Sequence, residues 1–272
     1  MTPGRTPAAV RTDRGDYRAA LAELTNAAVR TDSPSGAIVV VDGTGRWTER
    51  ALSAATSGAA ALVVAEPAPV PAAALDDLRA QVGGLPVIVS RSALRPDVIE
   101  DALRGRRDAG ALDILLVDAM CTVTTRPDVV RDAIGWMRAV GGGGVRMLSS
   151  AVQRGSVLAH LESVPPSGRA LPCSLSLAVA AGGWRGSLLR VSGLGAVRTE
   201  VLIDSEARIR TVDTLDERGS LRAPDRFEET ARGALRRALD VLAGDSSATD
   251  LADLAADARV ADAVLQAVPA HK

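Results

Sequence analysis

The first third of the chain alternates short apolar runs with amphipathic segments. Three runs of Ala, Ile, Leu and Val are too short for helices and are typical of strands buried on both faces: Ala37–Val41, Ala61–Val64 and Pro86–Ser90. Apolar residues at helical spacing predict helices between and before these runs, over Asp16–Thr31, Thr48–Ser57 and Ala72–Val82. This alternation predicts a parallel sheet with helices on both faces.

The pattern changes near residue 110. We predict a strand over Asp113–Val123, an amphipathic helix over Pro127–Val140 and another helix over Val145–Leu161. Four strand-like runs separated by short turns then predict an antiparallel meander: Ser174–Ala181, Ser187–Ser192, Arg198–Asp204 and Ala207–Val212. Two helical patterns close the chain, over Arg226–Ala243 and Thr249–Ala267. The second half is therefore predicted to be α+β with one broad sheet.

Composition narrows the classes of protein that fit this pattern. The chain has 272 residues, of which 47% are apolar and 24% charged, and its net charge is −1. This balance excludes disorder and argues against a nucleic-acid surface. No apolar stretch is long enough to span a membrane, and Met1–Asp16 lacks the apolar core of a secretory signal. We expect a cytoplasmic protein, and the Ala, Arg, Asp and Val bias indicates an actinobacterial source.

Reactive side chains are scarce. The single lysine is Lys272, and the two histidines are His160 and His271, so a mechanism that needs an internal lysine is excluded. Cys121 and Cys173 are too few for a disulfide framework and lack metal-ligand spacing. We expect both cysteines to be buried as small apolar residues. The large packing anchors are Trp47, Trp136 and Trp184.

Six segments follow one another in the order of a known two-domain family. They are Ala37–Leu62, Val64–Pro69 (VAEPAP), Pro86–Asp97, Trp136–Val152, Val191–Val197 and Asp257–Val264. In that order they resemble the last strands of a Rossmann domain with a Glu-Lys-Pro segment, a Gly-Gly-Gly segment before a catalytic helix, a Gly-x-x-Gly turn and a closing helix. Over residues 7–268 the chain resembles the Gfo/Idh/MocA family of NAD(P)-dependent sugar and polyol dehydrogenases.

The resemblance implies two domains and a partner surface. We expect residues 1–92 to form a truncated Rossmann-like domain in which the first βα units are missing. Residues 93–272 are expected to form an α+β domain with a large, open-faced, mainly antiparallel sheet, and the closing helices 226–267 to pack back on the first domain. Relatives dimerise through the open sheet, so a homo- or hetero-oligomer is expected. The strand Ala37–Val41 would need cover at its edge, from Ala8–Thr12 or from another protein.

The departures from the family concern its redox chemistry. No Gly-x-Gly-x-x-Gly turn follows a first strand, and the remaining candidate, Gly43–Thr48, is alternatively an ordinary turn. Ala65 or Glu66 stands at the position of the catalytic lysine, and Val152 at that of the catalytic histidine. Further family positions have lost their polar groups, at Trp47, Leu148 and Gly155. Without groups for a nicotinamide or an alcohol proton, we expect no cofactor and no metal.

Four residues remain as candidates for chemistry in the former substrate cleft: Glu66, Asp118, Arg146 and Gln153. Glu66 is a general base or a solvated loop carboxylate, and Asp118 is expected to face the cleft from its strand. His160 is a relocated base or a surface residue. Four arginines either surround an anionic ligand or form solvated faces: Arg91, Arg95, Arg146 and Arg154.

Three functions fit these observations. The first is a non-redox partner subunit, a pseudoenzyme that pairs through its open sheet with an active, full-length sugar- or polyol-type dehydrogenase. The second is a cofactor-independent isomerase, lyase or cyclase of a biosynthetic pathway. The third is an NAD(P)-dependent oxidoreductase with an altered cofactor site. The sequence names no substrate, because a fold does not determine a function.

Overall fold

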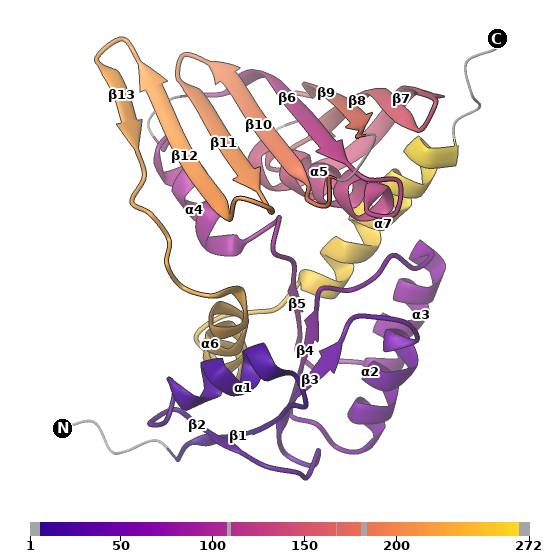
Figure 1. Cartoon of the computed structure of the whole chain (residues 1–272), viewed down its shortest axis with the longest axis vertical. Helices are drawn as coiled ribbons and strands as arrows, with labels where there is room; N and C mark the ends of the chain where they lie inside the picture. The colour runs from indigo at the N-terminus through magenta and orange to yellow at the C-terminus, as the bar shows by residue number, and fades with distance from the viewer. Residues whose placement is uncertain (1–5, 108–109, 167, 181–183, 267–272) are drawn as a thin grey trace. The chain divides into compact units, whose positions relative to one another are not determined.

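The computed structural model describes residues 6–107, 110–166, 168–180 and 184–266. The chain divides into two compact units (Figure 1). Unit 1 comprises Met1–Ser92 and Phe227–Ala255, and unit 2 comprises Ala93–Arg226 and Ala256–Lys272. Lys272 and His271 lie outside the described residues. No helix in the described ranges is long and apolar enough to cross a membrane.

Unit 1 contains a parallel sheet of five strands in the order β2-β1-β3-β4-β5. The strands are β1 (Ala8–Arg11), β2 (Ala28–Arg30), β3 (Ile38–Asp42), β4 (Ala61–Ala65) and β5 (Val87–Ser90). The three apolar runs of the sequence are β3, β4 and β5, and all their side chains except that of Asp42 are buried. The prediction of a parallel α/β unit is confirmed.

Helices cover both faces of this sheet at β3 and β4 (Figure 1). They are α1 (Gly15–Ala22), α2 (Trp47–Thr56), α3 (Ala72–Val82) and α6 (Thr230–Leu242). Val10, Ile38 and Val63 point to the face that carries α1 and α6, and they share one apolar cluster there with Leu21 and Leu235. α2 and α3 lie on the opposite face.

β1 corrects our expectation about the edge of β3. It pairs with β3 through Val10↔Ile38 and Arg11↔Val39, and it also pairs with β2. Because β1, α1 and β2 form a complete βαβ unit, the expectation that the first βα units are missing is wrong. The five strands match 2-1-4-5-6 of the doubly wound order 3-2-1-4-5-6. Residues 31–37 run from β2 directly to β3, so the third strand and its crossover helices are what this unit lacks.

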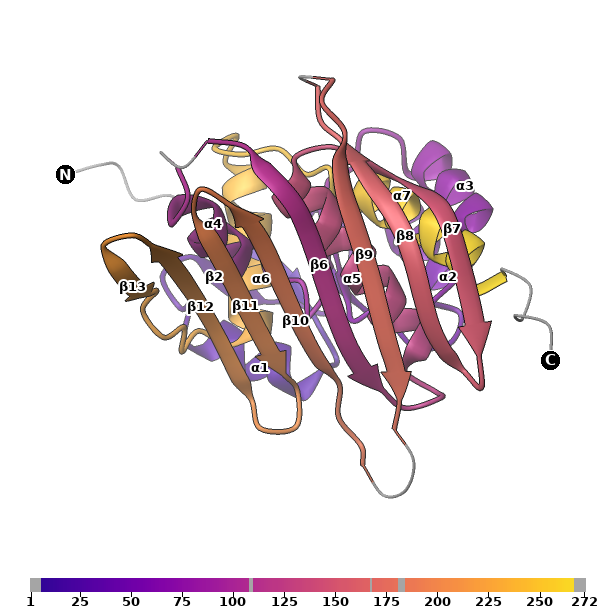
Figure 2. The same cartoon turned by 90° about the horizontal axis from the view of Figure 1, so that it is seen from above.

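Unit 2 contains an eight-stranded sheet in the order β13-β12-β11-β10-β6-β9-β8-β7 (Figure 2). The strands are β6 (Leu112–Cys121), β7 (Gly144–Gln153), β8 (Ser156–Val164), β9 (Leu171–Val179), β10 (Leu188–Gly195), β11 (Arg198–Asp204), β12 (Ile209–Asp216) and β13 (Gly219–Arg222). All neighbouring strands are antiparallel except β6 and β9. The helices are α4 (Pro96–Arg104), α5 (Arg126–Gly141) and the part of α7 (Asp250–Gln266) beyond Ala255. The prediction of a large, mainly antiparallel sheet is confirmed.

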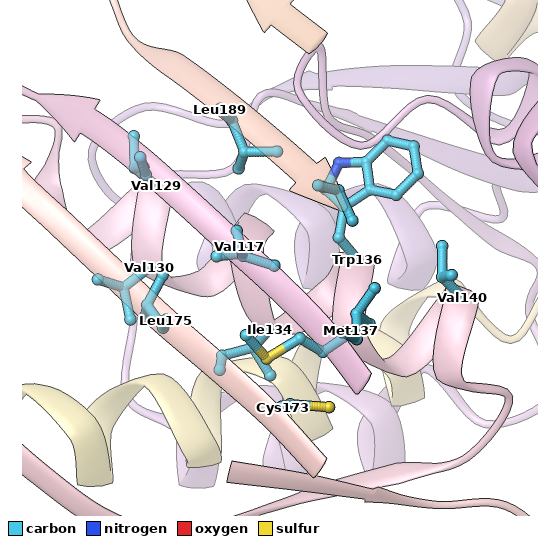
Figure 3. Close-up of a cluster of buried hydrophobic side chains, with 14 of the residues drawn as sticks. Val117, Val129, Val130, Ile134, Trp136, Met137, Val140, Cys173, Leu175 and Leu189 are labelled. Carbon is cyan, nitrogen blue, oxygen red and sulfur yellow. The ribbon is translucent and has the colours of Figure 1, made fainter. Parts of the chain in front are cut away.

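Alternate strand positions of unit 2 form a core against α5 (Figure 3). Val117 of β6 and Leu175 of β9 belong to the same apolar cluster as Val130 and Ile134 of α5. Trp136 of α5 is fully buried in this core, and its indole nitrogen donates a hydrogen bond to the carbonyl oxygen of Ala93 at 2.7 Å. The core therefore occupies one face of the sheet.

The intervening strand positions form the opposite face, which we call the open face. No helix covers it within the described part of the chain (Figure 2). Its central residues come from β6 and β8: Ile114, Leu116, Asp118, Met120, Leu158, His160 and Glu162. The side chains of Leu158 and His160 are exposed, and Leu158 retains 52% of its accessible surface.

Two helix predictions are wrong. The segment Val145–Leu161 forms strands β7 and β8, which pair as an antiparallel hairpin. From Val157 onward its buried side chains recur every second residue, the period of a strand. The helix predicted over Asp16–Thr31 ends at Ala22, and residues 28–30 form β2.

The glycine run Gly141–Gly144 has a structural role between α5 and β7. Gly142 adopts a left-handed φ of 74° and ends α5. A Cβ on Gly143 would lie 2.1 Å from the carbonyl oxygen of Val164, so only glycine allows the chain to pass this close to the end of β8. The run leads into a strand and not into the catalytic helix that the resemblance implied.

Candidate functional site

A cleft of about 590 Å³ lies at the carboxyl ends of β1 and β3 in unit 1. Its lining comes from the β1–α1 connection, from β3 and from α2: Arg11, Thr12, Asp13, Arg14, Gly15, Asp16, Val39, Val40, Val41, Asp42, Arg50, Ser53, Ala54 and Ser57. The helices that follow β1 and β3 lie on opposite faces of the sheet. Doubly wound folds bind ligands at such a switch point, so this cleft is the candidate site.

The N-terminus of α1 is occupied by a side chain of the protein itself. The carboxylate of Asp16 accepts a hydrogen bond from the backbone nitrogen of Tyr17 at 3.0 Å, and two from Arg14 at 2.8 and 3.1 Å. Partial burial works against ionisation, but Arg14 outweighs it, and the pKa of Asp16 lies below its usual value. A negative group is favourable at a helix N-terminus. A ligand phosphate would meet this carboxylate at the place where it needs free amides.

The β3–α2 connection contains the two glycines of the Gly43–Thr48 segment. A Cβ on Gly43 would lie 2.3 Å from the carbonyl oxygen of Glu66, so glycine is needed for the approach of two backbones. Trp47 is fully buried, and its indole nitrogen donates to the carbonyl oxygen of Ala68 at 3.0 Å. These contacts account for the segment as a packed turn without a bound phosphate.

Charges of both signs line the cleft. Arg14 forms salt bridges with Asp16 at 2.8 Å and with Asp42 at 3.3 Å. Asp42 also accepts a hydrogen bond from the backbone nitrogen of Thr44 at 2.9 Å. This bond, together with the nearby Arg14 and Arg50, outweighs partial burial and holds the pKa of Asp42 below its usual value. Both carboxylates are therefore ionised at neutral pH and committed to Arg14.

Glu66 stands where β4 ends, directly before Pro67. Its backbone has a φ of 50°, an uncommon conformation for a residue with a side chain. The side chain is exposed, and the Ser92 hydroxyl donates to its carboxylate at 3.5 Å. Nearby Tyr17 is buried, and this burial raises the pKa of its hydroxyl to about 12. A carboxylate thus occupies the strand end at which the resemblance places a lysine.

The three other predicted site residues belong to unit 2 and do not converge. Asp118 lies on the open face of β6, opposite Arg190 of β10. Arg146 and Gln153 lie on β7, which is separated from β6 by β8 and β9. Seven residues along a strand place Arg146 and Gln153 roughly 23 Å apart, and Arg146 forms an ion pair with Glu162. These residues share a sheet but no pocket.

The other charged candidates are buried, lie in a turn or are exposed on a strand. Arg95 is buried and forms hydrogen bonds of 2.9 and 2.5 Å with Asp97, and Arg91 is also buried. Arg154 lies in the tight turn between β7 and β8 with a φ of 50°. His160 is exposed on β8. No group of three or more metal-ligating side chains occurs among the residues that the structure describes.

Both cysteines and two of the three tryptophans are buried in the apolar interior of their units. Cys121 and Cys173 are free and buried, and burial raises the pKa of Cys173 to about 11. Trp47 and Trp136 are fully buried, one in each unit. Trp184 is half-buried.

Sequence patterns missed most of the cleft. Arg11, Asp13 and Arg50 were not candidates, because β1 is only four residues long and its register beside β3 was unknown. The available signal was the polar stretch that separates the apolar AAV of β1 from the helical pattern after Gly15.

Comparisons with protein-family models and with curated protein sequences found no match. Solved structures are similar over nearly the whole chain. An NADPH-dependent oxidoreductase of Desulfitobacterium hafniense has a TM-score of 0.69 at 8% identity, with 96% of both chains covered. An oxidoreductase of Sinorhizobium meliloti also has a TM-score of 0.69, at 11% identity, with 96% of this chain and 97% of that chain covered.

A third similar structure is a variant of KijD10, a 3-ketoreductase of Actinomadura kijaniata, in complex with TDP-benzene and NADP. Its TM-score is 0.66 at 14% identity, and 98% of this chain and all of that chain are covered. At such identities the likeness shows a shared fold, in which a Rossmann-like sheet is joined to a broad second sheet.

Proposed function

We propose that this protein, which has the Gfo/Idh/MocA-type oxidoreductase fold, is a non-redox partner subunit of an active sugar- or polyol-type dehydrogenase. It would pair with the active subunit through the open face of unit 2. The observation that carries the proposal is the Asp16 carboxylate at the N-terminus of α1. It argues against a dinucleotide in this chain and assigns the redox chemistry to another subunit.

Electrostatics supports the non-redox half of the proposal. In this fold a dinucleotide brings its diphosphate to the N-terminus of the helix after the first strand, where it needs unoccupied backbone amides. Near the start of α1 the protein instead places three carboxylates, from Asp13, Asp16 and Asp42, and two of them already neutralise Arg14. The sequence contains no lysine before Lys272 that would handle the proton of an alcohol.

The composition of the open face supports the partner half. Its central strand β6 presents half-buried Ile114, Leu116 and Met120, and β8, which is separated from β6 by β9, presents exposed Leu158. Asp118 of this surface lies opposite Arg190 in register. Apolar side chains interspersed with polar residues are typical of protein interfaces, and charges fix the register of the partners. A dehydrogenase subunit of the same fold offers an equivalent broad sheet as its counterpart.

A second function is favoured by the backbone of Glu66. A non-glycine residue held at a φ of 50° stores strain, and such residues cluster at functional sites. Its exposed carboxylate, with the Ser92 hydroxyl at 3.5 Å, is equipped to act as a general base without a cofactor. Under this alternative the protein is a cofactor-independent isomerase, lyase or cyclase.

Calorimetric titration with NAD and NADP, followed by co-purification, tests the proposal. We expect no heat of binding at millimolar dinucleotide, and co-elution of this chain with a family dehydrogenase expressed beside it. Micromolar dinucleotide binding by the isolated chain would contradict the non-redox assignment. Turnover that is lost in Glu66→Gln, without any partner, would transfer the function to the second candidate.

A further inference from the structure

The parallel sheet of unit 1 is incompletely covered beside β1 and β2. Parallel sheets normally carry helices on both faces. Here α1 and α6 pack on one face, and α2 and α3 cover β3 and β4 on the other (Figure 1). On this second face Val29 of β2 retains 52% of its accessible surface, and Arg11 of β1 is half-exposed. Because residues 31–37 supply no crossover helix, the cleft extends along β3 between β1 and α2.

Two guanidinium groups in this cleft, those of Arg11 and Arg50, form no salt bridge within the described part of the chain. The side chain of Arg11 has no hydrogen-bond or ion-pair partner among the residues that the structure describes. Arg50 donates hydrogen bonds to the backbone carbonyl oxygens of Asp42, at 2.7 Å, and of Thr44. These bonds fix the Arg50 head without cancelling its charge. By contrast, the two salt bridges of Arg14 leave it no charge for a ligand.

The remaining lining offers groups that bind hydroxyls. Ser53 follows Arg50 by three residues and the C-cap residue Ser57 follows Ser53 by four, so all three lie on one side of α2. Asp13 lines the cleft from the β1–α1 connection with an exposed carboxylate. Val39 and Val41 form an apolar floor. Cations from β1 and α2, together with these hydroxyls and a carboxylate outside the salt bridges of Arg14, match an anionic head on a polyhydroxy body.

We propose that this cleft binds a small anionic polyhydroxy molecule, a sugar acid or a sugar monophosphate, with its anionic group between Arg11 and Arg50. The volume of 590 Å³ is ordinary for a small-molecule site. The ligand would lie against β3 and α2, on the sheet face that a crossover helix would otherwise cover. The proposal concerns a separate surface from the open face and does not rest on the partner role.

Calorimetric titration of the full chain with three probes tests the proposal: gluconate, glucose 6-phosphate and neutral glucose. We expect one of the two anions to bind and glucose to bind far more weakly. Arg11→Gln and Arg50→Gln should each weaken binding by about tenfold or more, since each removes a charged hydrogen-bond donor. The matched control is Arg18→Gln, which changes an exposed arginine of α1 that does not line the cleft.

A cleft-filling variant guards against effects on folding. Ser57 is the exposed C-cap residue that directly follows α2, and Ser57→Phe should abolish binding while leaving the thermal unfolding midpoint near that of the wild type. The proposal is overturned if neither anion binds, or if binding survives both arginine substitutions. Inorganic phosphate that binds as tightly as glucose 6-phosphate would also overturn it, because the polyhydroxy body would then contribute nothing. Each of these three results leaves the partner proposal to be decided by its own co-purification.

Discussion

The two sheets of this protein use their faces differently. The central strands of unit 1 are buried on both sides, so its binding groups are confined to strand ends and to the cleft beside β1. The strands of unit 2 bury alternate residues and leave the open face without a covering helix in the described part of the chain (Figure 2). The first arrangement favours a small molecule and the second favours a macromolecule. We therefore propose ligand binding at unit 1 and partner binding at unit 2.

The largest expected effect is a loss of stability when the core on the other side of the open-face sheet is disrupted. Trp136 is fully buried and bonded to Ala93. Trp136→Ala should lower the free energy of unfolding by about 3–5 kcal/mol, because it leaves a cavity and an unpaired carbonyl. Chemical denaturation followed by circular dichroism measures this loss. The control Trp136→Phe retains most of the packing, and equal effects of the two variants would contradict the account.

The next prediction compares the two sheets directly. Leu158 on the open face and Val29 on β2 are both 52% exposed, so they form a matched pair. Leu158→Arg should weaken the complex with the dehydrogenase by about 100-fold, a typical value for an interface hot spot. Val29→Arg should leave the complex unchanged. Both variants should keep the wild-type stability of the isolated chain, to within about 0.5 kcal/mol. Co-purification measures the difference, and an equal loss in both would refute the assignment.

A smaller effect is expected from removing the charge of one ion-paired aspartate in each unit. Asp101 of unit 2 is buried and bonds Arg226 at 2.7 and 2.5 Å. Asp250 of unit 1 is less buried, and it bonds Arg237 and the backbone nitrogen of Val89. Asp101→Asn should cost about 2 kcal/mol of unfolding free energy and Asp250→Asn about 1 kcal/mol, in proportion to burial. Denaturant titration of both variants measures the two losses of unfolding free energy. A larger loss in Asp250→Asn than in Asp101→Asn would contradict the prediction.

The smallest effect depends on pH at the start of α1. The folded-state pKa of Asp16 is lowered, so its stabilisation is present above the unfolded pKa of about 3.9 and is lost as the pH falls through the folded value. Because the side chain is 48% exposed, solvent screening limits this contribution to a few tenths of a kcal/mol. Asp16→Asn should therefore be slightly less stable than the wild type at neutral pH and equal to it near pH 2. A difference that grows on acidification would contradict the arrangement.

Strands with continuous apolar runs were predictable from the sequence. β3, β4 and β5 stand out because burial on both faces demands Ile, Leu, Val and Ala at every position before the last polar residue of β3 and β5. β1 and β2 do not, because three or four residues that end in arginine give no periodic signal. Their positions depend on pairing with β3, a contact distant in sequence. The sequence analysis therefore took the first βα units to be missing, whereas the structure lacks the third strand.

The prediction of a helix in place of the hairpin of β7 and β8 was wrong for a different reason. Gly-Gly-Gly-Gly before Val145 matched the family segment that precedes a helix, and this resemblance outweighed the alternation in residues 157–163. The same error placed Arg146 and Gln153 in a predicted helix, whereas both lie on strand β7. Glu66 was located correctly at the end of β4 because Pro67 and the prolines after it predict that a regular strand ends there. The cleft around Arg11 and Arg50 required the register of β1 and could not be predicted locally.

The most direct test of the partner assignment is native mass spectrometry of this protein isolated from its producing organism. The account predicts a heteromer with a full-length family dehydrogenase, in which dinucleotide accompanies the dehydrogenase and never this chain alone. A homo-oligomer, or a single chain that retains NAD or NADP, would contradict it.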